Sequence, residues 1–281
     1  MSNSKEHLQK LLGRIGVYER VKASWIYDFY WSIADRQILR DRRKEVEFYW
    51  NLLKGFRRGD LIFDVGANCG YKSDIFLRLG ARVVAIEPDQ MCQIVLKEKF
   101  LRYRVKGKPL VVVEKAVSDK SSTETMWIDS PASGKNTFSQ KWVETLRSDE
   151  VRFGHKLSFG QVKQVETVSV EQLIAEHGTP FFVKVDVEGY ELNVLQGLQR
   201  PVPYLSFEVN LPEFRAEGLK CVQVLRQLTR DGEFNYTPDC RRGLVLDKWM
   251  RSQEFLGVLS SCSDPSIEVF WKTRSECTGS P

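Results

Sequence analysis

Apolar and polar positions along the middle of the chain change repeatedly between a strand-like and a helix-like period. A short apolar run, LIFDV at 61–65, ends at a glycine-rich turn, and apolar residues at helical spacing follow at 71–79. A second run, RVVAI at 82–86, precedes helical spacing at 90–100 and a third run, LVVVEKAV, at 110–117. Strands that alternate with helices in this way predict β-α-β units and a parallel sheet.

The same rhythm returns in the second half of the chain. We expect strands at 181–186 and 204–210, with a helix at 190–198 between them and another at 213–229. Two further apolar segments, EFNYTP and SIEVFWKT, are expected to be a final pair of strands. The pattern predicts an α/β fold with a doubly wound, Rossmann-like sheet, mostly parallel with an antiparallel last strand. We assign this domain to 59–274 and expect a frayed tail at 275–281.

An N-terminal segment at 1–58 carries apolar and aromatic residues at helical intervals, which predicts a helical extension. Two groups of residues make this pattern: Trp25, Ile26, Phe29, Tyr30 and Ile33, then Val46, Phe48, Tyr49, Trp50, Leu52 and Leu53. Packing on the core is the favoured interpretation, because large aromatic side chains usually supply buried area. A lid over the acceptor site, a dimer face and contact with a membrane surface are the alternatives.

A segment at 121–161 departs from the strand-helix rhythm. Its beginning, SSTETMWIDS, is compatible with a strand, and the rest is rich in turn-forming and polar residues. A loop region of this length inside a compact domain is usually functional or mobile. We therefore expect this variable insertion to recognise the acceptor.

The glycine-rich turn after the first strand favours one class of nucleotide cofactor over another. A dinucleotide-binding turn reads G-x-G-x-x-G, whereas this chain has Gly66-x-Asn68-x-Gly70 and no third glycine. Glu87, after the next strand, would bind the ribose diol of either cofactor. Asp64 would repel a pyrophosphate but attract the ammonium of an amino-acid group. These residues favour S-adenosylmethionine, and a turn that binds no ligand is the structural alternative.

Six motifs in the same region resemble the FkbM-type S-adenosylmethionine-dependent methyltransferase family. They are DVGANCGYKS (64–73), VVAIEPD (83–89), EKAVSD (114–119), TVSVEQL (167–173), FVKVDVEGYELNVLQGL (182–198) and LSFEVN (205–210). The resemblance implies a Rossmann-like methyltransferase domain that transfers a methyl group to a hydroxyl oxygen of a sugar, glycan or natural-product acceptor. It places the turn at Ser118 and Asp119 beside the adenine, although an ordinary polar turn is also compatible with these residues.

The candidate cofactor-binding residues combine the chemistry of the turn with this resemblance. They are Asp64, Gly66, Ala67, Asn68, Gly70, Ser73, Glu87, Pro88, Ser118, Asp119 and Asp186. The turn and the resemblance together predict S-adenosylmethionine as the cofactor. The alternatives are a nicotinamide-dependent oxidoreductase and a cofactor-binding scaffold without catalysis.

Two carboxylates at the end of the strand at 181–186 are the candidate catalytic residues. Methyl transfer to a hydroxyl needs alignment of the acceptor and removal of one proton, and a carboxylate near the methyl group can accept that proton. We predict Asp186 as this base and Glu188 as the second choice. The alternative is that Glu188 caps the next helix while Asp186 orders the turn. Without a clear third ligand we predict no metal, although Glu208 and Asn210 could line the acceptor pocket.

Composition narrows the remaining possibilities. The chain has 281 residues, a net charge of +5 and six scattered cysteines without C-x-x-C pairs. This charge gives no nucleic-acid footprint, and the basic residues at 36–58 are interspersed with acids, as on a solvated helix face. The cysteines indicate reduced thiols rather than a zinc site or a disulfide framework. The N-terminus lacks the order of a signal peptide and the apolar runs are too short to span a membrane, so we expect a cytoplasmic protein. A homodimer is compatible with the sequence.

Overall fold

The computed structural model describes residues 36–101, 110–148, 157–273 of the chain, and the aromatic segment expected at 25–33 lies outside them. Its strands are β1 (Leu61–Val65), β2 (Arg82–Ile86), β3 (Leu110–Val113), β4 (Ala116–Ser118), β5 (Thr123–Ile128), β6 (Gln161–Ser169), β7 (Phe182–Val185), β8 (Tyr204–Asn210), β9 (Glu233–Thr237), β10 (Met250–Arg251) and β11 (Ser266–Lys272). Its helices are α4 (Arg36–Leu52), α5 (Tyr71–Leu79), α6 (Gln90–Lys99), α8 (Gln140–Ser148), α10 (Val170–His177), α11 (Glu191–Gln196), α12 (Arg215–Leu228) and α13 (Ser252–Ser261), with a short 3-10 helix, η1 (Cys240–Arg242).

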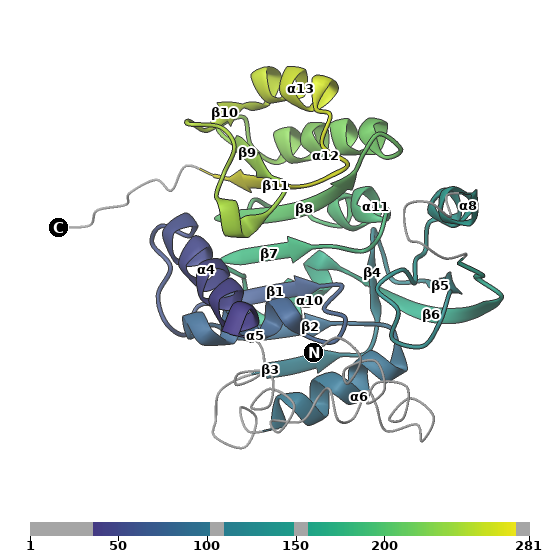
Figure 1. Cartoon of the computed structure of the whole chain (residues 1–281). Coiled ribbons are helices and arrows are strands. Elements are labelled where there is room, and N and C mark those ends of the chain that lie inside the picture. The colour runs from purple at the N-terminus through teal and green to yellow at the C-terminus, as the bar shows by residue number, and fades with distance from the viewer. Residues whose placement is uncertain (1–35, 102–109, 149–156, 274–281) are drawn as a thin grey trace.

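A large sheet runs through the middle of the molecule in the order β10-β9-β11-β8-β7-β1-β2-β3 (Figure 1). Five consecutive strands of this sheet, β3, β2, β1, β7 and β8, are parallel to one another, and β11 is antiparallel to both β8 and β9. The predicted fold class, a mostly parallel doubly wound sheet with an antiparallel strand from the C-terminal end of the chain, is confirmed. Because β2 lies on one side of β1 and β7 on the other, the order of the strands reverses between β1 and β7. Ligands of open α/β sheets bind at such a point.

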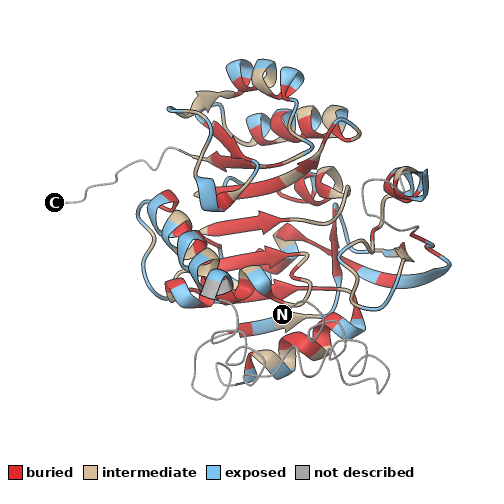
Figure 2. Cartoon of the chain, viewed as in Figure 1, coloured by how far each residue is buried: buried red, intermediate tan, exposed pale blue. Residues whose placement is uncertain are grey.

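Helices cover both faces of this sheet, and neighbouring residues of a strand therefore face different cores. In β1, Phe63 packs in one core with α10, α11, α12 and α13, whereas Ile62 packs in the other with α4, α5 and α6. Every residue of β1 and β7 is buried, as Figure 2 shows by the red strands at the centre. Burial on both faces is why these strands read as continuous apolar runs rather than as alternating ones.

The helix α4 packs on the sheet through its last two turns. Tyr49 is fully buried and makes edge contacts with Phe76 and Phe270, at ring-centroid distances of 5.1 and 6.4 Å. Glu45 accepts hydrogen bonds from the Tyr71 hydroxyl at 2.8 Å and the Lys72 ammonium at 2.7 Å. These contacts join α4 to the first residues of α5, the helix that follows the glycine-rich turn. Among the residues described, no helix is both long and apolar enough to cross a membrane.

The expected third strand at 110–117 is two strands in two different sheets, which corrects the sequence prediction. β3 pairs with β2 in the large sheet, whereas β4 pairs with β6 in a smaller sheet of order β4-β6-β5. The exposed Glu114 and Lys115 separate them. The apolar run is continuous across this charged pair in the sequence, so its pattern alone did not show the change of sheet.

The segment at 121–161 also has more regular structure than expected. β5 pairs with β6 in the small sheet, and α8 presents Trp142, Val143 and Leu146 to the core. These three residues lie on one helical face, which explains why the segment folds as a helix despite its polar composition. The small sheet stands beyond the carboxyl ends of β1, β2 and β7, where the arrows point in Figure 1. The insertion is therefore next to the point at which the strand order reverses.

Candidate active site

The turn between β1 and α5 lies against the end of β7. Gly66 has a φ of 77°, and a Cβ atom at this position would be 1.8 Å from the carbonyl oxygen of Asp186. Only glycine allows that approach, because any side chain would push the two strand ends apart. The amides of Gly66 and Ala67 both donate to the carbonyl of Ile86, at 3.0 and 3.1 Å. The turn is thus fixed to both neighbouring strands of the sheet.

Glu87 holds this turn from the other side. Its carboxylate accepts hydrogen bonds from the backbone amides of Asn68 at 2.7 Å and Asp89 at 2.8 Å. Burial raises the pKa of Glu87 to about 7, against the opposing effect of these two amides. The side chain is therefore a buried acceptor of hydrogen bonds that is preorganised before any ligand enters.

A cleft of about 720 Å³, including its part open to solvent, lies over the turn and the strand ends. Its walls come from Gly66 and Asn68 in the turn, Glu87 and Pro88 after β2, Lys115 to Val117 at β4, Ser133, Gly134, Asn136 and Phe138 in the insertion, and Asp186 to Glu188 after β7. The cleft therefore brings the variable insertion together with four motifs that are separate in the sequence.

The predicted cofactor-binding residues divide into those in the wall of the cleft and those behind it. Gly66, Asn68, Glu87, Pro88 and Asp186 belong to the wall. Ala67, Gly70 and Ser73 support the turn from behind, and Asp64 is completely buried. Ser118 and Asp119 also lie outside the wall, which is formed instead by the three residues that precede them. The Ser118 hydroxyl is 3.2 Å from the hydroxyl of Tyr190.

A buried lysine links Asp64 to Asp186. The Lys184 ammonium is 2.9 Å from an Asp186 carboxylate oxygen and 3.8 Å from Asp64. Asp64 also accepts a hydrogen bond of 2.6 Å from the Ser73 hydroxyl. In this structure, therefore, protein groups supply the cationic and hydrogen-bonding partners of Asp64, the residue expected to attract a ligand ammonium.

The environment of Asp186 keeps its carboxyl group ionised. Burial favours the neutral acid, but the charge of Lys184 and its hydrogen bond outweigh burial, and the pKa of Asp186 is lowered. Its side chain remains 37% exposed toward the cleft, whereas that of Lys184 is 4% exposed. Asp186 is consequently an accessible carboxylate that is paired with a buried ammonium group.

Glu188 binds the insertion rather than the helix that follows it. Its carboxylate lies 3.0 and 3.3 Å from the Lys135 ammonium and accepts a hydrogen bond of 3.0 Å from the Trp142 indole. The N-cap residue of α11, Tyr190, makes no side-chain capping hydrogen bond, and Glu191 orders the preceding turn by accepting from the amides of Val187 and Gly189. The alternative in which Glu188 caps this helix is therefore not what the structure shows.

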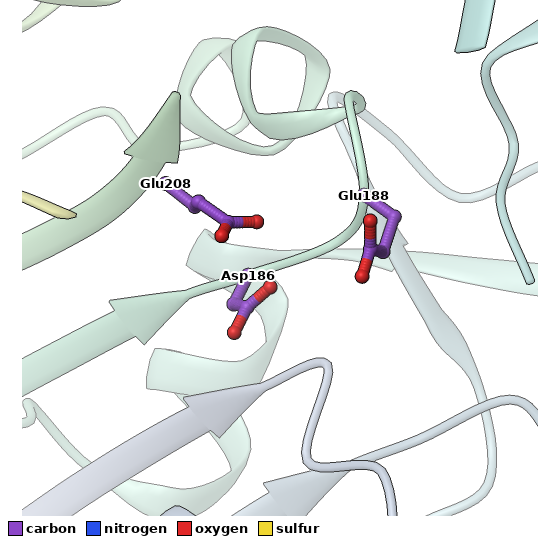
Figure 3. Close-up of side chains that lie close together, drawn as sticks. All are labelled: Asp186, Glu188 and Glu208. Carbon is purple, nitrogen blue, oxygen red and sulfur yellow. The ribbon is translucent and has the colours of Figure 1, made fainter. Parts of the chain in front are cut away.

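A third carboxylate joins the two candidate catalytic residues. Asp186, Glu188 and Glu208 point toward one another in Figure 3, and one oxygen of each lies within 4.8 Å of the others. Burial, together with the charges of Asp186 and Glu188, raises the pKa of Glu208 well above its usual value. Three carboxylates at this spacing have the geometry to ligate a divalent cation, and Glu208 is the third candidate ligand that the sequence had not identified.

Sequence reasoning missed the basic and aromatic partners of these acids. Lys184 was hidden inside an apolar strand, although a lysine between buried valines is itself a sign of a paired charge. Lys135 and Trp142 were assigned only to a variable segment, and nothing in their spacing connects them to Glu188. These three side chains set the charge and shape around the carboxylates.

Comparisons with known proteins identify methyltransferases as relatives of this chain. The chain matches the methyltransferase FkbM domain over residues 64–234. It is 28% identical over 180 residues to the hexuronic acid methyltransferase AglP of Haloferax volcanii, covering 63% of this chain and 66% of the relative. It is 30% identical over 162 residues to the 31-O-demethyl-FK506 methyltransferase FkbM of Streptomyces tacrolimicus, covering 51% of this chain and 61% of the relative.

A solved structure of the methyltransferase FkbM from Methylobacillus flagellatus is 17% identical to this chain, with a TM-score of 0.47. That match covers 76% of this chain and 44% of the other. The region that matches the family model, residues 64–234, contains the glycine-rich turn, Glu87 and the three carboxylates. The chain belongs to the methyltransferase FkbM domain family.

Proposed function

We propose that this protein transfers a methyl group from S-adenosylmethionine to a hydroxyl oxygen of a sugar, glycan or natural-product acceptor. The observation that carries the proposal is the cleft at the reversal of strand order, which has a buried carboxylate, Glu87, on one side and a lysine-supported carboxylate, Asp186, on the other. Membership of the methyltransferase FkbM domain family supports the reaction type.

The residues of the cleft suit a nucleoside with an amino-acid group. Glu87 presents a carboxylate to a ribose diol, and Gly66, which has no side chain, lies in the wall of the same cleft. A pyrophosphate would meet the carboxylates of Glu87 and Asp186 in the same cleft, which disfavours a nicotinamide dinucleotide. When bound, S-adenosylmethionine supplies an electrophilic methyl group on a sulfonium centre.

Asp186 acts as the base in this proposal. The acceptor hydroxyl would lose its proton to an Asp186 carboxylate oxygen while its own oxygen displaces S-adenosylhomocysteine from the methyl carbon, so that the O–C bond forms as the C–S bond breaks. Lys184 keeps that carboxylate ionised and, being almost completely buried, restricts its orientation. Glu188 is oriented by Lys135 and Trp142, so its expected role is to hold the acceptor by hydrogen bonds.

The polar and aromatic side chains around Glu188 support a hydroxylated acceptor. Lys135 and Trp142 come from the insertion, and Phe138 stands near Tyr190 at a ring-centroid distance of 5.6 Å. Trp142 is 1% exposed, so the aromatic face in the wall of the cleft is that of Phe138. An aromatic face next to hydrogen-bonding groups is suited to binding sugars, which present both apolar and hydroxyl surfaces. The names of the two relatives, a hexuronic acid methyltransferase and an FK506 methyltransferase, agree with acceptors of this kind.

A calorimetric titration with S-adenosylhomocysteine, run beside oxidised nicotinamide adenine dinucleotide, tests the cofactor. We expect micromolar binding of the first ligand alone, on the order of −8 kcal/mol. Binding of only the second would support the oxidoreductase, and binding of neither would contradict a cofactor site in this cleft. With the first result, labelled S-adenosylmethionine and a panel of hydroxylated acceptors identify the substrate class, and no transfer to any hydroxyl would favour the scaffold.

A further inference from the structure

Two cysteines that are separate in the sequence meet beside the cleft. The Sγ atoms of Cys69 and Cys92 are 3.8 Å apart. Cys69 belongs to the glycine-rich turn and is partly exposed, whereas Cys92 lies in the first turn of α6 and is 1% exposed. Sulfur atoms at this separation need only a small movement to reach the bonding distance of about 2.05 Å.

The pair connects the two segments that hold Glu87. On one side, Asn68 donates its backbone amide to Glu87 and is the residue immediately before Cys69. On the other side, Asp89 donates its backbone amide to Glu87 and caps α6 by accepting from the amide of Cys92. The Cys92 thiol also lies 3.8 Å from the side-chain oxygen of Asn68. A bond between the sulfurs would therefore act directly on the ends of the Glu87 hydrogen bonds.

We propose that Cys69 and Cys92 close to a reversible disulfide that weakens cofactor binding; the effect on binding rests on the function proposed above. Oxidised glutathione is the chemical class of oxidant. The partly exposed Cys69 attacks it as a thiolate and releases one reduced glutathione, and Cys92 then displaces the second from the mixed disulfide. Two protons leave the protein thiols, and the two electrons reduce oxidised glutathione to two thiols.

Packing around the turn explains why the disulfide disturbs the site. A Cβ atom at Gly70 would be 2.6 Å from Leu96 and from Phe100, so the turn already rests on α6 and cannot approach it further as a rigid body. The sulfurs can meet only through local rotation about the bonds of Cys69 and Asn68. Asn68, with a φ of 48°, has little conformational freedom to absorb that rotation and keep its hydrogen bond to Glu87.

Mass spectrometry and calorimetry of one protein preparation test the proposal. The full-length protein is equilibrated with reduced or oxidised glutathione, and each sample is digested and mapped before titration with S-adenosylhomocysteine. We expect a Cys69–Cys92 crosslinked peptide, a mass lower by two hydrogen atoms, and binding about tenfold weaker, the effect of disturbing one hydrogen bond to a charged group. Reduction with dithiothreitol should restore both mass and affinity.

Two variants separate this pair from the other thiols. Cys92→Ser should give no crosslink, and its affinity should be the same with either form of glutathione. Cys262→Ser, which changes a buried cysteine on the other side of the sheet, should retain the full response. A crosslink between other cysteines, or no crosslink, would overturn the proposal.

Formation of the disulfide and its effect on cofactor binding can be tested separately. A crosslink with unchanged affinity would overturn the regulatory effect while leaving the cofactor assignment intact. If the reduced protein does not bind S-adenosylhomocysteine, the proposed function and the effect on binding both fail, whereas peptide mapping still shows whether the disulfide forms.

Discussion

The ammonium of Lys184 lies between two aspartates of neighbouring strands, 2.9 Å from Asp186 and 3.8 Å from Asp64. Lys184 and Asp64 are partners in the parallel register of β7 and β1, and Asp186 follows two residues later on the same side of the strand. One buried cation therefore neutralises a structural carboxylate under the turn and the carboxylate proposed as the base.

Removal of this cation should destabilise the fold. Lys184→Met leaves Asp64, which is completely buried, without its cationic partner, and breaking a buried pair in this way costs about 3 to 5 kcal/mol. Urea unfolding measures the loss. Lys141→Met is the matched control, because it breaks an exposed ion pair with Glu217 and should cost about 1 kcal/mol or less. Adding Asp64→Asn to Lys184→Met should recover part of the stability. If Lys184→Met alone is as stable as Lys141→Met, the pairing of Lys184 with Asp64 does not contribute as expected.

Replacement of the proposed base should reduce turnover without removing cofactor binding. In Asp186→Asn the side chain keeps its size but cannot accept the hydroxyl proton, so kcat should fall by about 10² to 10⁴. The measurement is the initial rate of labelled methyl transfer, together with the affinity for S-adenosylhomocysteine. Asp231→Asn, an exposed aspartate paired with Arg251, should leave the rate unchanged. Unchanged turnover in Asp186→Asn would remove Asp186 from the mechanism.

Cofactor affinity should depend on pH through Glu87. Burial raises the pKa of this carboxyl group to about 7, so it is largely ionised at pH 8 and protonated at pH 6. The ionised form is the better acceptor for a ribose diol, and affinity for S-adenosylhomocysteine should fall as the pH decreases through 7. Calorimetry at several pH values measures the profile.

The stability of the free protein should respond to Glu87 with the opposite sign. Because the folded pKa, about 7, lies above the ordinary value of 4.5, the folded state holds this proton more tightly and the Glu87 contribution decreases as the pH rises between these values. Burial raises the pKa of Glu191 to about 8, so Glu191 titrates in a similar pH range. The variant Glu87→Gln isolates the effect, because it should remove only the Glu87 contribution from the pH dependence of stability and of cofactor affinity. If the pH dependence of S-adenosylhomocysteine binding is unchanged in this variant, Glu87 is not the group that controls it.

Activity should not require a divalent metal. Lys184 and Lys135 already neutralise two of the three clustered carboxylates, at 2.9 and 3.0 Å, and a metal ion would have to displace both. We expect the same methyl-transfer rate in excess chelator as in added Mg²⁺ or Mn²⁺. The prediction would be contradicted if chelator abolished activity and one of these ions restored it. If the ion did not restore activity in Glu208→Gln, the ion would be assigned to the carboxylate cluster.

The sequence was sufficient for the parts of the fold that depend on nearby residues. The strands at Leu61–Val65 and Arg82–Ile86 and the helix at Tyr71–Leu79 have the predicted bounds, because glycines and short apolar runs mark their ends. The meeting of Asp186 with the glycine-rich turn also followed from the sequence, since parallel strands bring their carboxyl ends to one edge.

Interactions between distant segments could not be predicted in the same way. The Glu188 carboxylate finds Lys135 and Trp142 in the insertion, and no periodicity connects these positions. The change of sheet between β3 and β4 depends on pairing with β6, which is far along the chain. The 3.8 Å approach of Cys69 to Cys92 likewise arises from the way α6 packs on the turn.

The insertion is bonded to both ends of the cleft. Asn136 donates to Asp89 at 3.0 Å, next to the nucleoside side, while Lys135 and Thr137 contact Glu188, next to the proposed acceptor side. Three consecutive residues thus connect the side of the cleft proposed for the cofactor with the side proposed for the acceptor. Engineering a new acceptor preference through this segment will therefore shift cofactor affinity as well, and variants selected for one property have to be screened for the other.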